Sequence, residues 1–211
     1  GVYDRQIFTI DVANTNDAPE FTSEPVTEAT EDSLYSYAMT VEDDDIMHGD
    51  ILTFAASILP NWLTFDEDST ISGIPENGDV GNHDVWVTVS DGVTTVVDSF
   101  TITVINTNDA PVIVDQDSLI TLEDTPLEIT LSDLIVTDDD IDIGYSTYPD
   151  DFTLTVLDGD NYTVEGTTVN PDTNYFGWLT VPVYVDDGEA VDSLSNTFNL
   201  EVEVTPVNDA P

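Results

Sequence analysis

The feature that most constrains this chain is a short motif that returns at domain-sized intervals. The sequence Asn-Asp-Ala-Pro occurs at 16–19, 108–111 and 208–211, so successive copies lie 92 and 100 residues apart. Each copy follows a stretch in which hydrophobic and polar residues alternate, such as Phe8, Ile10 and Val12 before the first copy. Repeats of about 100 residues are whole domains rather than units of a solenoid. The repeat therefore predicts a domain over 16–107 and a second over 108–211, with residues 1–15 as the last strand of a preceding repeat.

Both repeats have the sequence pattern of β structure. Val85, Val87 and Val89 in the first repeat share one face of a strand, and 179–185 shows the same alternation in the second. Clusters of Gly, Pro, Asn and Asp separate these stretches, as expected of turns. No stretch has a convincing helical period. About seven strands in about 95 residues fit a Greek-key sandwich. We therefore predict an all-β fold of two tandem immunoglobulin-like β-sandwiches.

The charge of the chain is extreme and limits its partners. Forty-five Asp and Glu residues face a single basic residue, Arg5, and the formal net charge is -44. This charge repels nucleic acids and anionic membrane surfaces, so we expect neither as a partner. Cysteine is absent, which excludes a disulfide framework and zinc-thiolate sites. Such a charge also strains a compact fold through self-repulsion, so we expect metal cations to neutralise part of it.

Acidic and amide residues gather at the expected junction between the two repeats. Asp-x-Asp follows an early strand of the second repeat, and Asp187 follows a later one, so both should lie beside the incoming linker. Calcium takes six to eight oxygen ligands, mainly from carboxylates, carboxamides and backbone carbonyls. Any single acid is more often a solvated turn residue, and only the whole constellation indicates a site. The predicted Ca²⁺ ligands at this junction are Glu31, Asn106, Asn108, Asp109, Asp138, Asp140 and Asp187.

The other two ends carry incomplete versions of this set. At the first, the candidate ligands are Asn14, Asn16, Asp17, Asp43, Asp45 and Asp91, without the Glu of a preceding domain. We expect partial calcium occupancy there. At the last, Glu123, Asn208 and Asp209 lack the Asp-x-Asp of a following domain, and we expect little binding.

Several motifs, agreeing in order and spacing, resemble bacterial cadherin-like modules over nearly the whole chain. The first repeat is similar to the dystroglycan-type variety, through Leu-Pro-Asn-Trp-Leu-Thr-Phe-Asp at 59–66 and Ser-Gly-Ile-Pro at 72–75. The second resembles another cadherin-like variety of long bacterial surface proteins, through Leu-Glu-Asp-Thr-Pro at 122–126 and Tyr-Thr-Val-Glu-Gly at 162–166. The resemblance implies an extracellular, bacterial surface or secreted location and a role in adhesion.

The resemblance also implies calcium binding at the linker. Cadherin-type linkers bind calcium through Asp-x-Asn-Asp-Asn, an upstream Glu and a downstream Asp-x-Asp. Asn108 and Asp109 match this pattern, whereas Asn106 stands where the family often has Asp and Ala110 where it has Asn. The first repeat also lacks the family's Asp-Arg-Glu motif. These departures remove ligands, so one or two ions per junction are expected instead of two or three.

Catalysis finds no support in the sequence, and we expect no enzyme activity. His48 and His83 are the only histidines, and neither lies in a catalytic motif. Two functional classes remain, with calcium as the shared ligand. The first is an adhesive spacer whose junction calcium stiffens, with like modules on other cells as partners. The second is a carbohydrate-binding module, because Trp86 and Tyr184 should face outward and could stack on a polysaccharide. The sequence leaves open whether a loop or a neighbouring domain covers these two rings.

Overall fold

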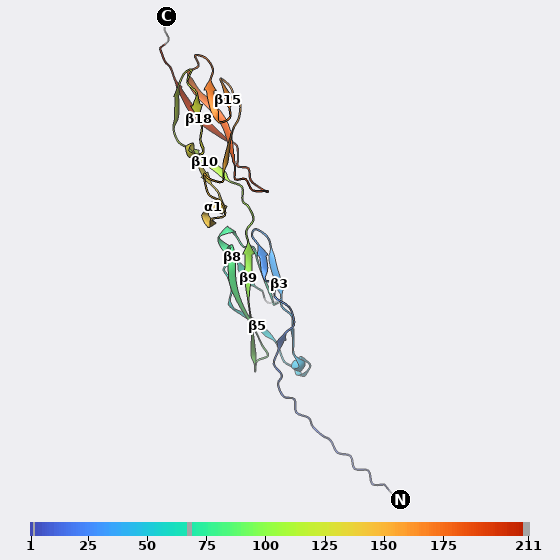
Figure 1. Cartoon of the computed structure of the whole chain (residues 1–211). Helices are drawn as coiled ribbons and strands as arrows, with labels where there is room; N and C mark the ends of the chain where they lie inside the picture. Colours follow the sequence, from blue (N-terminus) through green and yellow to red (C-terminus); the bar gives the residue numbers. More distant parts are fainter. Residues whose placement is uncertain (2, 67–68, 209–211) are drawn as a thin grey trace. The chain divides into compact units, whose positions relative to one another are not determined.

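Strictly alternating hydrophobic residues form the core of each half of the chain. The computed structural model describes residues 1, 3–66 and 69–208. It divides into unit 1, Gly1–Asn106, and unit 2, Thr107–Pro211 (Figure 1). In unit 1, Val85, Val87 and Val89 of strand β8 (Gly81–Ser90) are completely buried. Burying one such side chain contributes about 1.5–3 kcal/mol, so this strand is a main source of stability.

Unit 1 is a sandwich of a larger and a smaller sheet. The larger has the order β2-β9-β8-β5 and the smaller the order β3-β7-β6, while β1 pairs with β4 beside them. Strand β2 runs parallel to β9, and the other pairs are antiparallel. The remaining strands of the unit are β1 (Glu20–Phe21), β2 (Glu28–Thr30), β3 (Tyr35–Ala38), β4 (Val41–Glu42), β5 (Thr53–Ile58), β6 (Leu63–Phe65), β7 (Thr70–Gly73) and β9 (Thr95–Ile105).

Unit 2 repeats this architecture. Its larger sheet has the order β11-β18-β17-β14, its smaller sheet the order β12-β16-β15, and β10 pairs with β13. Strand β11 again runs parallel to its neighbour, β18. The strands are β10 (Val112–Gln116), β11 (Leu119–Leu122), β12 (Leu127–Glu128), β13 (Leu134–Thr137), β14 (Thr153–Val156), β15 (Tyr162–Glu165), β16 (Thr168–Pro171), β17 (Gly177–Asp186) and β18 (Phe198–Thr205). The predicted all-β, immunoglobulin-like fold is confirmed.

Short helical turns interrupt the strands at equivalent places. Helix η1 (Asp44–His48) follows β4 in unit 1, and α1 (Asp139–Ile143) follows β13 in unit 2. Each ends at a glycine with positive φ, Gly49 at 114° and Gly144 at 83°, a conformation that favours glycine at helix C-termini. Two further 3-10 turns are η2 (Asn77–Asp79) and η3 (Leu131–Asp133). In each Asp-x-Asp motif only the first residue, Asp43 or Asp138, has an extended backbone, and the second lies in the helical turn.

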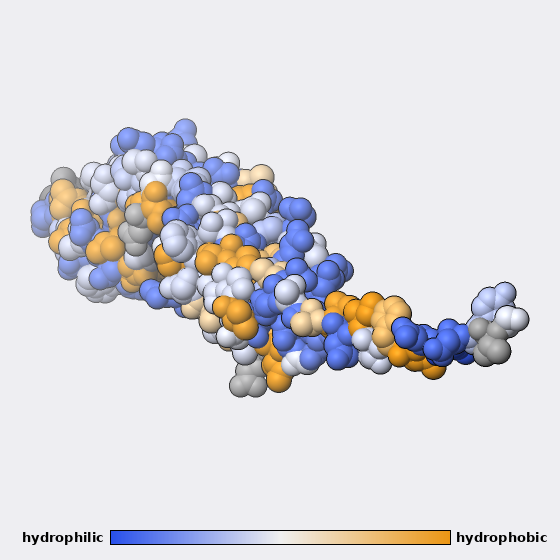
Figure 2. Space-filling model, turned by 90° about the horizontal axis from the view of Figure 1, so that it is seen from below, coloured by the Kyte–Doolittle hydropathy of each residue, from blue (hydrophilic) through white to orange (hydrophobic). Residues whose placement is uncertain are grey.

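Residues 3–12 of unit 1 expose their hydrophobic side chains. Phe8, Ile10 and Val12 are exposed, and Figure 2 shows hydrophobic side chains on the surface of this thin N-terminal segment. By their distance from the following Asn-Asp-Ala-Pro motif, these positions correspond to Phe100, Ile102 and Val104 of β9. Ile102 and Val104 are buried in the core. That residues 1–15 complete the sheet of a preceding repeat stays a prediction.

Among the residues that the structure describes, no helix is both long and apolar enough to cross a membrane.

Candidate cation sites

Strand ends bring the acids of unit 2 to the place where the chain enters the unit. Strand β13 ends directly before Asp138, and β17 ends directly before Asp187. The entering residues bond to these loops. The Asp109 N–H donates to Asp140 Oδ2 at 2.8 Å, and Asn108 Nδ2 donates to Asp187 Oδ2 at 3.1 Å. Asp138, Asp140 and Asp187 are all buried. We call Asn108, Asp109, Asp138, Asp140 and Asp187 the unit 2 cluster.

Asp138 is the residue of this cluster that most needs a positive partner. Its Oδ1 accepts the Asp140 N–H at 2.8 Å and so caps helix α1. Its Oδ2 is buried and has no hydrogen-bond partner among the described residues. Burial raises the pKa of the Asp138 carboxyl, the Asp140 N–H opposes this, and the charges of Asp140, Asp187 and Asp109 raise it further. A buried carboxylate oxygen without a donor is costly, and a bound cation would remove that cost.

Unit 1 repeats the same hydrogen-bond network around its own entering residues. The Asp17 N–H donates to Asp45 Oδ2 at 2.6 Å, as Asp109 does to Asp140. Asn16 Nδ2 donates to Asp91 Oδ2 at 2.9 Å, as Asn108 does to Asp187. The Asp45 N–H donates to Asp43 Oδ1 at 2.7 Å, and Asp43 Oδ2 is again buried without a partner among the described residues. Because the same network occurs in both units, it indicates a functional site rather than an accidental result of loop packing.

The remaining bonds of unit 1 keep two of its acids ionised. The Asp17 N–H and the Asn14 side chain lower the pKa of Asp45, and the Thr94 N–H and the Asn16 side chain lower that of Asp91. Carboxylates with a lowered pKa stabilise the fold above their ordinary pKa, and the contribution is lost as pH falls through the lowered value. Both acids are therefore charged and available to a cation at neutral pH.

Asp50 joins this site although no sequence pattern singled it out. Asp43, Asp50 and Asp91 each offer a carboxylate oxygen, and the three oxygens lie within 4.8 Å of one another. Asp50 Oδ2 is buried without a partner among the described residues. Burial raises the pKa of Asp50, and the charges of Asp43, Asp45 and Asp91 raise it further. Counted from the Asp-x-Asp motif, the equivalent residue of unit 2 is Tyr145, so the two repeats gave no matching signal. With Asp50, the predicted ligands Asn14, Asn16, Asp17, Asp43, Asp45 and Asp91 form the unit 1 cluster.

The donor set of both clusters suits a hard divalent cation. All candidate ligands are carboxylates, carboxamides or backbone carbonyls, the oxygen donors that Ca²⁺ prefers. The chain has no cysteine, and neither cluster contains a histidine ligand, so softer metals are less suited. Bound Ca²⁺ would supply positive charge to oxygens such as Asp43 Oδ2 and Asp138 Oδ2, which have no donor of their own.

Glu31 and Asn106 lie at the other end of unit 1, where the chain leaves it. The Glu31 N–H donates to the carbonyl of Ile105, the last residue of β9, at 3.0 Å. Glu31 is buried, and Asn106 directly follows β9. Unit 2 has the same arrangement, because Glu123 is buried and its N–H donates to the Thr205 carbonyl at 2.9 Å. That Glu31 and Asn106 are calcium ligands stays a prediction, and Asp209 lies outside the described residues.

Comparisons with known proteins agree with this architecture. Residues 18–105 match the model of the Putative Ig domain family, He_PIG. A search of curated protein sequences finds no match.

Solved cadherin ectodomains share the fold. Human protocadherin-24 EC1-2 is 16% identical over 92% of this chain and 100% of that chain, with a TM-score of 0.57. Drosophila N-cadherin EC1-4 is 16% identical over 92% of this chain and 50% of that chain, at 0.56. The extracellular domain of protocadherin GammaB4 is 17% identical over 94% of this chain and 34% of that chain, at 0.59. Identities this low establish a cadherin-like fold and nothing further.

Some matches to larger proteins are too weak to support an inference about function. The chain spans 28% and 29% of the length of two endo-fucoidan hydrolase structures from glycoside hydrolase family 107. Their TM-scores are 0.39 and 0.38.

The two aromatic residues proposed for sugar binding differ in exposure. Trp86 on β8 is exposed, as expected from its place opposite the buried valines. Tyr184 on β17 is only half-buried and offers less of its ring than the strand pattern suggested. A third aromatic residue, Trp178, is more exposed than either and also lies on β17.

Replacing Asp50 with asparagine is expected to stabilise unit 1 without calcium and to weaken its calcium binding. A raised carboxyl pKa means that the folded state binds more protons than the unfolded state, so stability falls as pH rises through that window. Asp50→Asn removes this loss, and thermal unfolding in chelator should show a higher melting temperature at neutral pH. The gain should vanish at acid pH, where Asp50 is protonated. Asp44→Asn, an exposed neighbour on η1, is the matched control. A lower melting temperature in chelator would contradict the assignment.

Proposed function

We propose that this chain is a calcium-binding adhesion or spacer module of a bacterial surface or secreted protein, without catalytic activity. Calcium bound at the unit 2 cluster fixes the linker 106–111 to unit 2 and so stiffens the junction. Glu31 and Asn106 complete the ligand set from unit 1, an assignment that rests on the sequence pattern. The two repeats are a dystroglycan-type cadherin-like domain followed by a second cadherin-like domain.

One observation carries this proposal: linker residues bond directly to buried acids. Strand β9 ends at Ile105 and β10 begins at Val112, so Asn108 and Asp109 belong to the connection itself. Both hydrogen-bond to acids that follow β13 and β17. A cation shared by Asp138, Asp140 and Asp187 would hold those acids together against their mutual repulsion. The backbone of the linker would then be held in one position on unit 2.

The names of similar solved structures support an extracellular location. The similar solved structures include one whose name describes it as an extracellular domain and others named as cadherins. His48 lies 3.7 Å from Asp45, and His83 Nε2 lies 2.5 Å from the Asp79 carbonyl. That the chain has no enzyme activity stays a prediction.

Small-angle scattering with calcium and with chelator tests the stiffening. We expect a narrower distribution of interatomic distances with calcium, at unchanged circular dichroism, because polar junctions between domains are mobile by default. A chain that begins at Ala13 keeps Asn14 and lacks the exposed hydrophobic segment that contains residues 3–12, which could pair with another molecule. If calcium changes only the version with that segment, the effect is association between molecules and the stiffening is refuted.

A further inference from the structure

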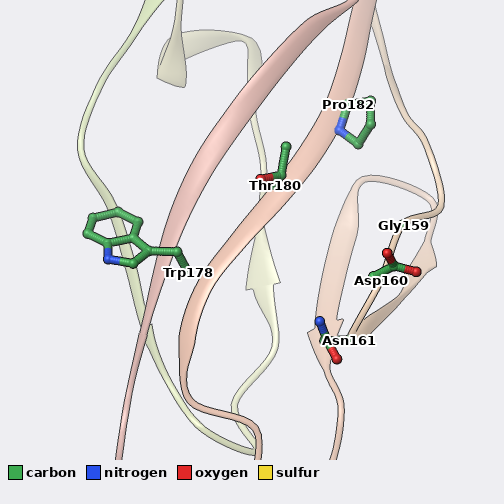
Figure 3. A pocket seen from close by; sticks show the side chains of 6 residues that line it. All are labelled: Gly159, Asp160, Asn161, Trp178, Thr180 and Pro182. Carbon is green, nitrogen blue, oxygen red and sulfur yellow. The ribbon is translucent and has the colours of Figure 1, made fainter.

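A pocket of about 440 Å³ opens on the outer face of unit 2. Strand β17 supplies one side, because Trp178, Thr180 and Pro182 alternate with the buried residues of that strand. The loop between β14 and β15 supplies the other side with Gly159, Asp160 and Asn161. Figure 3 shows Thr180 between the indole of Trp178 and the side chains of Asp160 and Asn161. The pocket thus has an aromatic end and a polar end.

Hydrogen bonds hold the loop side of the pocket in place. The Leu157 N–H donates to the Pro182 carbonyl at 2.9 Å and ties the start of the loop to β17. The buried Tyr162 donates its hydroxyl to the Leu157 carbonyl at 2.9 Å. Gly159 lies against the Tyr162 ring, where a Cβ would come within 2.4 Å of the hydroxyl oxygen. A pocket whose walls are ordered before binding loses less entropy when a ligand enters.

The polar groups of the pocket are available to a ligand. Within the described residues, no hydrogen bond engages the side chains of Asp160 and Asn161. Trp178 is 61% exposed, although burying an indole is favourable. A large exposed aromatic ring beside unused hydrogen-bonding groups indicates a binding surface.

We propose that this pocket binds a short segment of a neutral polysaccharide, with one sugar ring on Trp178 and an adjoining ring beside Asp160 and Asn161. The C–H groups on one face of a pyranose carry small positive charges and pack on the negative face of an indole. The hydroxyls of the adjoining ring donate to a carboxylate such as Asp160 and exchange hydrogen bonds with a carboxamide such as Asn161. An apolar peptide would leave both polar side chains without partners.

The surrounding charge selects a neutral sugar over an anionic one. On β18, Glu203 lies opposite Trp178 and Glu201 lies opposite Thr180. The Thr180 hydroxyl is 3.5 Å from Glu201 Oε1, so these carboxylates border the pocket. Sulfated or uronic sugars, and nucleic acids, would bring like charge against Asp160, Glu201 and Glu203. The hydroxyls of a neutral sugar meet them as donors.

This sugar site is independent of the proposed cation site. Trp178 lies near the start of β17, and Asp187 follows its end. Nine residues of extended strand separate the two positions by about 30 Å, well beyond a shared ligand. Sugar binding should therefore persist in chelator, and loss of either activity leaves the other measurable.

Affinity electrophoresis of the whole chain tests the sugar site. The gels contain a soluble β-glucan, mannan, xylan or galactan, and alginate serves as the anionic comparison. At least one neutral polysaccharide should retard the chain, with or without calcium. Trp178→Ala should raise the dissociation constant about tenfold or more, since a central tryptophan commonly dominates an interface. Tyr145→Ala, which removes an exposed aromatic ring of unit 2 that does not line the pocket, should not change it.

Three results would overturn the sugar site. They are an absence of retardation by all four neutral polysaccharides, unchanged retardation of Trp178→Ala, and equal retardation by alginate. Trp178→Phe keeps an aromatic face and should restore part of the binding, which a purely structural role of the indole does not predict. Near-ultraviolet circular dichroism verifies that each variant retains its packing.

Discussion

Replacing Asp138 and Asp140 together with asparagine is expected to abolish calcium binding at the unit 2 cluster and to leave both units folded. Asparagine keeps an oxygen that accepts the Asp140 and Asp109 N–H groups, so the cap of α1 and the linker contact survive. The substitution removes two charges that the ion needs. The affinity should fall at least about 100-fold, because even losing a neighbour of a metal ligand costs 10–100-fold.

Asp139 provides the matched control for this variant. It lies between the two replaced residues and is exposed, whereas Asp138 and Asp140 are buried. Asp139→Asn makes the same chemical change in the same turn and should leave the affinity nearly unchanged. Equal losses in both variants would show that general charge, and not a defined site, attracts calcium. The unit 1 cluster should keep its calcium in both variants.

Adding calcium to the unmodified chain should raise its melting temperature substantially. Extracellular calcium modules bind with dissociation constants of about 0.1–1 mM, so about 10 mM calcium should add roughly 1.4–2.7 kcal/mol to the stability of a unit with one site. For a domain of about 100 residues this shifts the midpoint by on the order of 5–15 °C. The physical source is relief of repulsion among buried acids such as Asp50 and Asp138.

The control for this prediction separates binding from screening. A chain with a net charge of -44 gains stability from any salt, because salt screens repulsion between its carboxylates. Sodium chloride at matched ionic strength should therefore produce a smaller shift, which the Asp138 and Asp140 replacement does not alter. If sodium chloride reproduces the whole effect of calcium, the stabilisation is general and the clusters are not sites.

The fold could be predicted because the repeat marks both domains and their strands. Val85, Val87 and Val89 alternate as a half-buried strand requires, and the structure buries all three. The first and last residues of the strands were harder to predict than the fold. The alternation of Leu127, Ile129 and Leu131 predicts one strand, but β12 ends at Glu128 and η3 follows. Asp133 accepts the Thr130 N–H at 2.7 Å and so favours the turn.

The candidate ligands could be predicted where a motif carries them and not where packing recruits them. Asp43 and Asp138 follow strands in both repeats, so the period of the sequence identifies them. Asp50 reaches the unit 1 cluster only because η1 turns the chain back at Gly49, and Tyr145 takes the equivalent place in unit 2. A sequence alignment of the two repeats therefore does not identify Asp50, the residue by which the two clusters differ most.

The pocket at Trp178 depends on contacts that sequence patterns do not report. Its loop crosses to β17 through the bond between Leu157 and Pro182, which are 25 positions apart in the sequence. Strand periodicity predicts that Tyr184 faces outward from β17, and it leaves the orientation of Trp178 undecided. It does not distinguish the exposed tryptophan from the half-buried tyrosine, because that difference depends on neighbouring elements.

Isothermal titration of the unmodified chain with calcium tests the central claim most directly. We predict saturable binding with at least one ion at the unit 1 cluster and at least one at the unit 2 cluster, in a salt concentration that screens surface charge. Their dissociation constants should lie at about 0.1–1 mM or below. Replacing Asp138 and Asp140 should remove the contribution of unit 2 alone. A titration without saturable binding in that range, or one that the replacement leaves unchanged, would contradict the account.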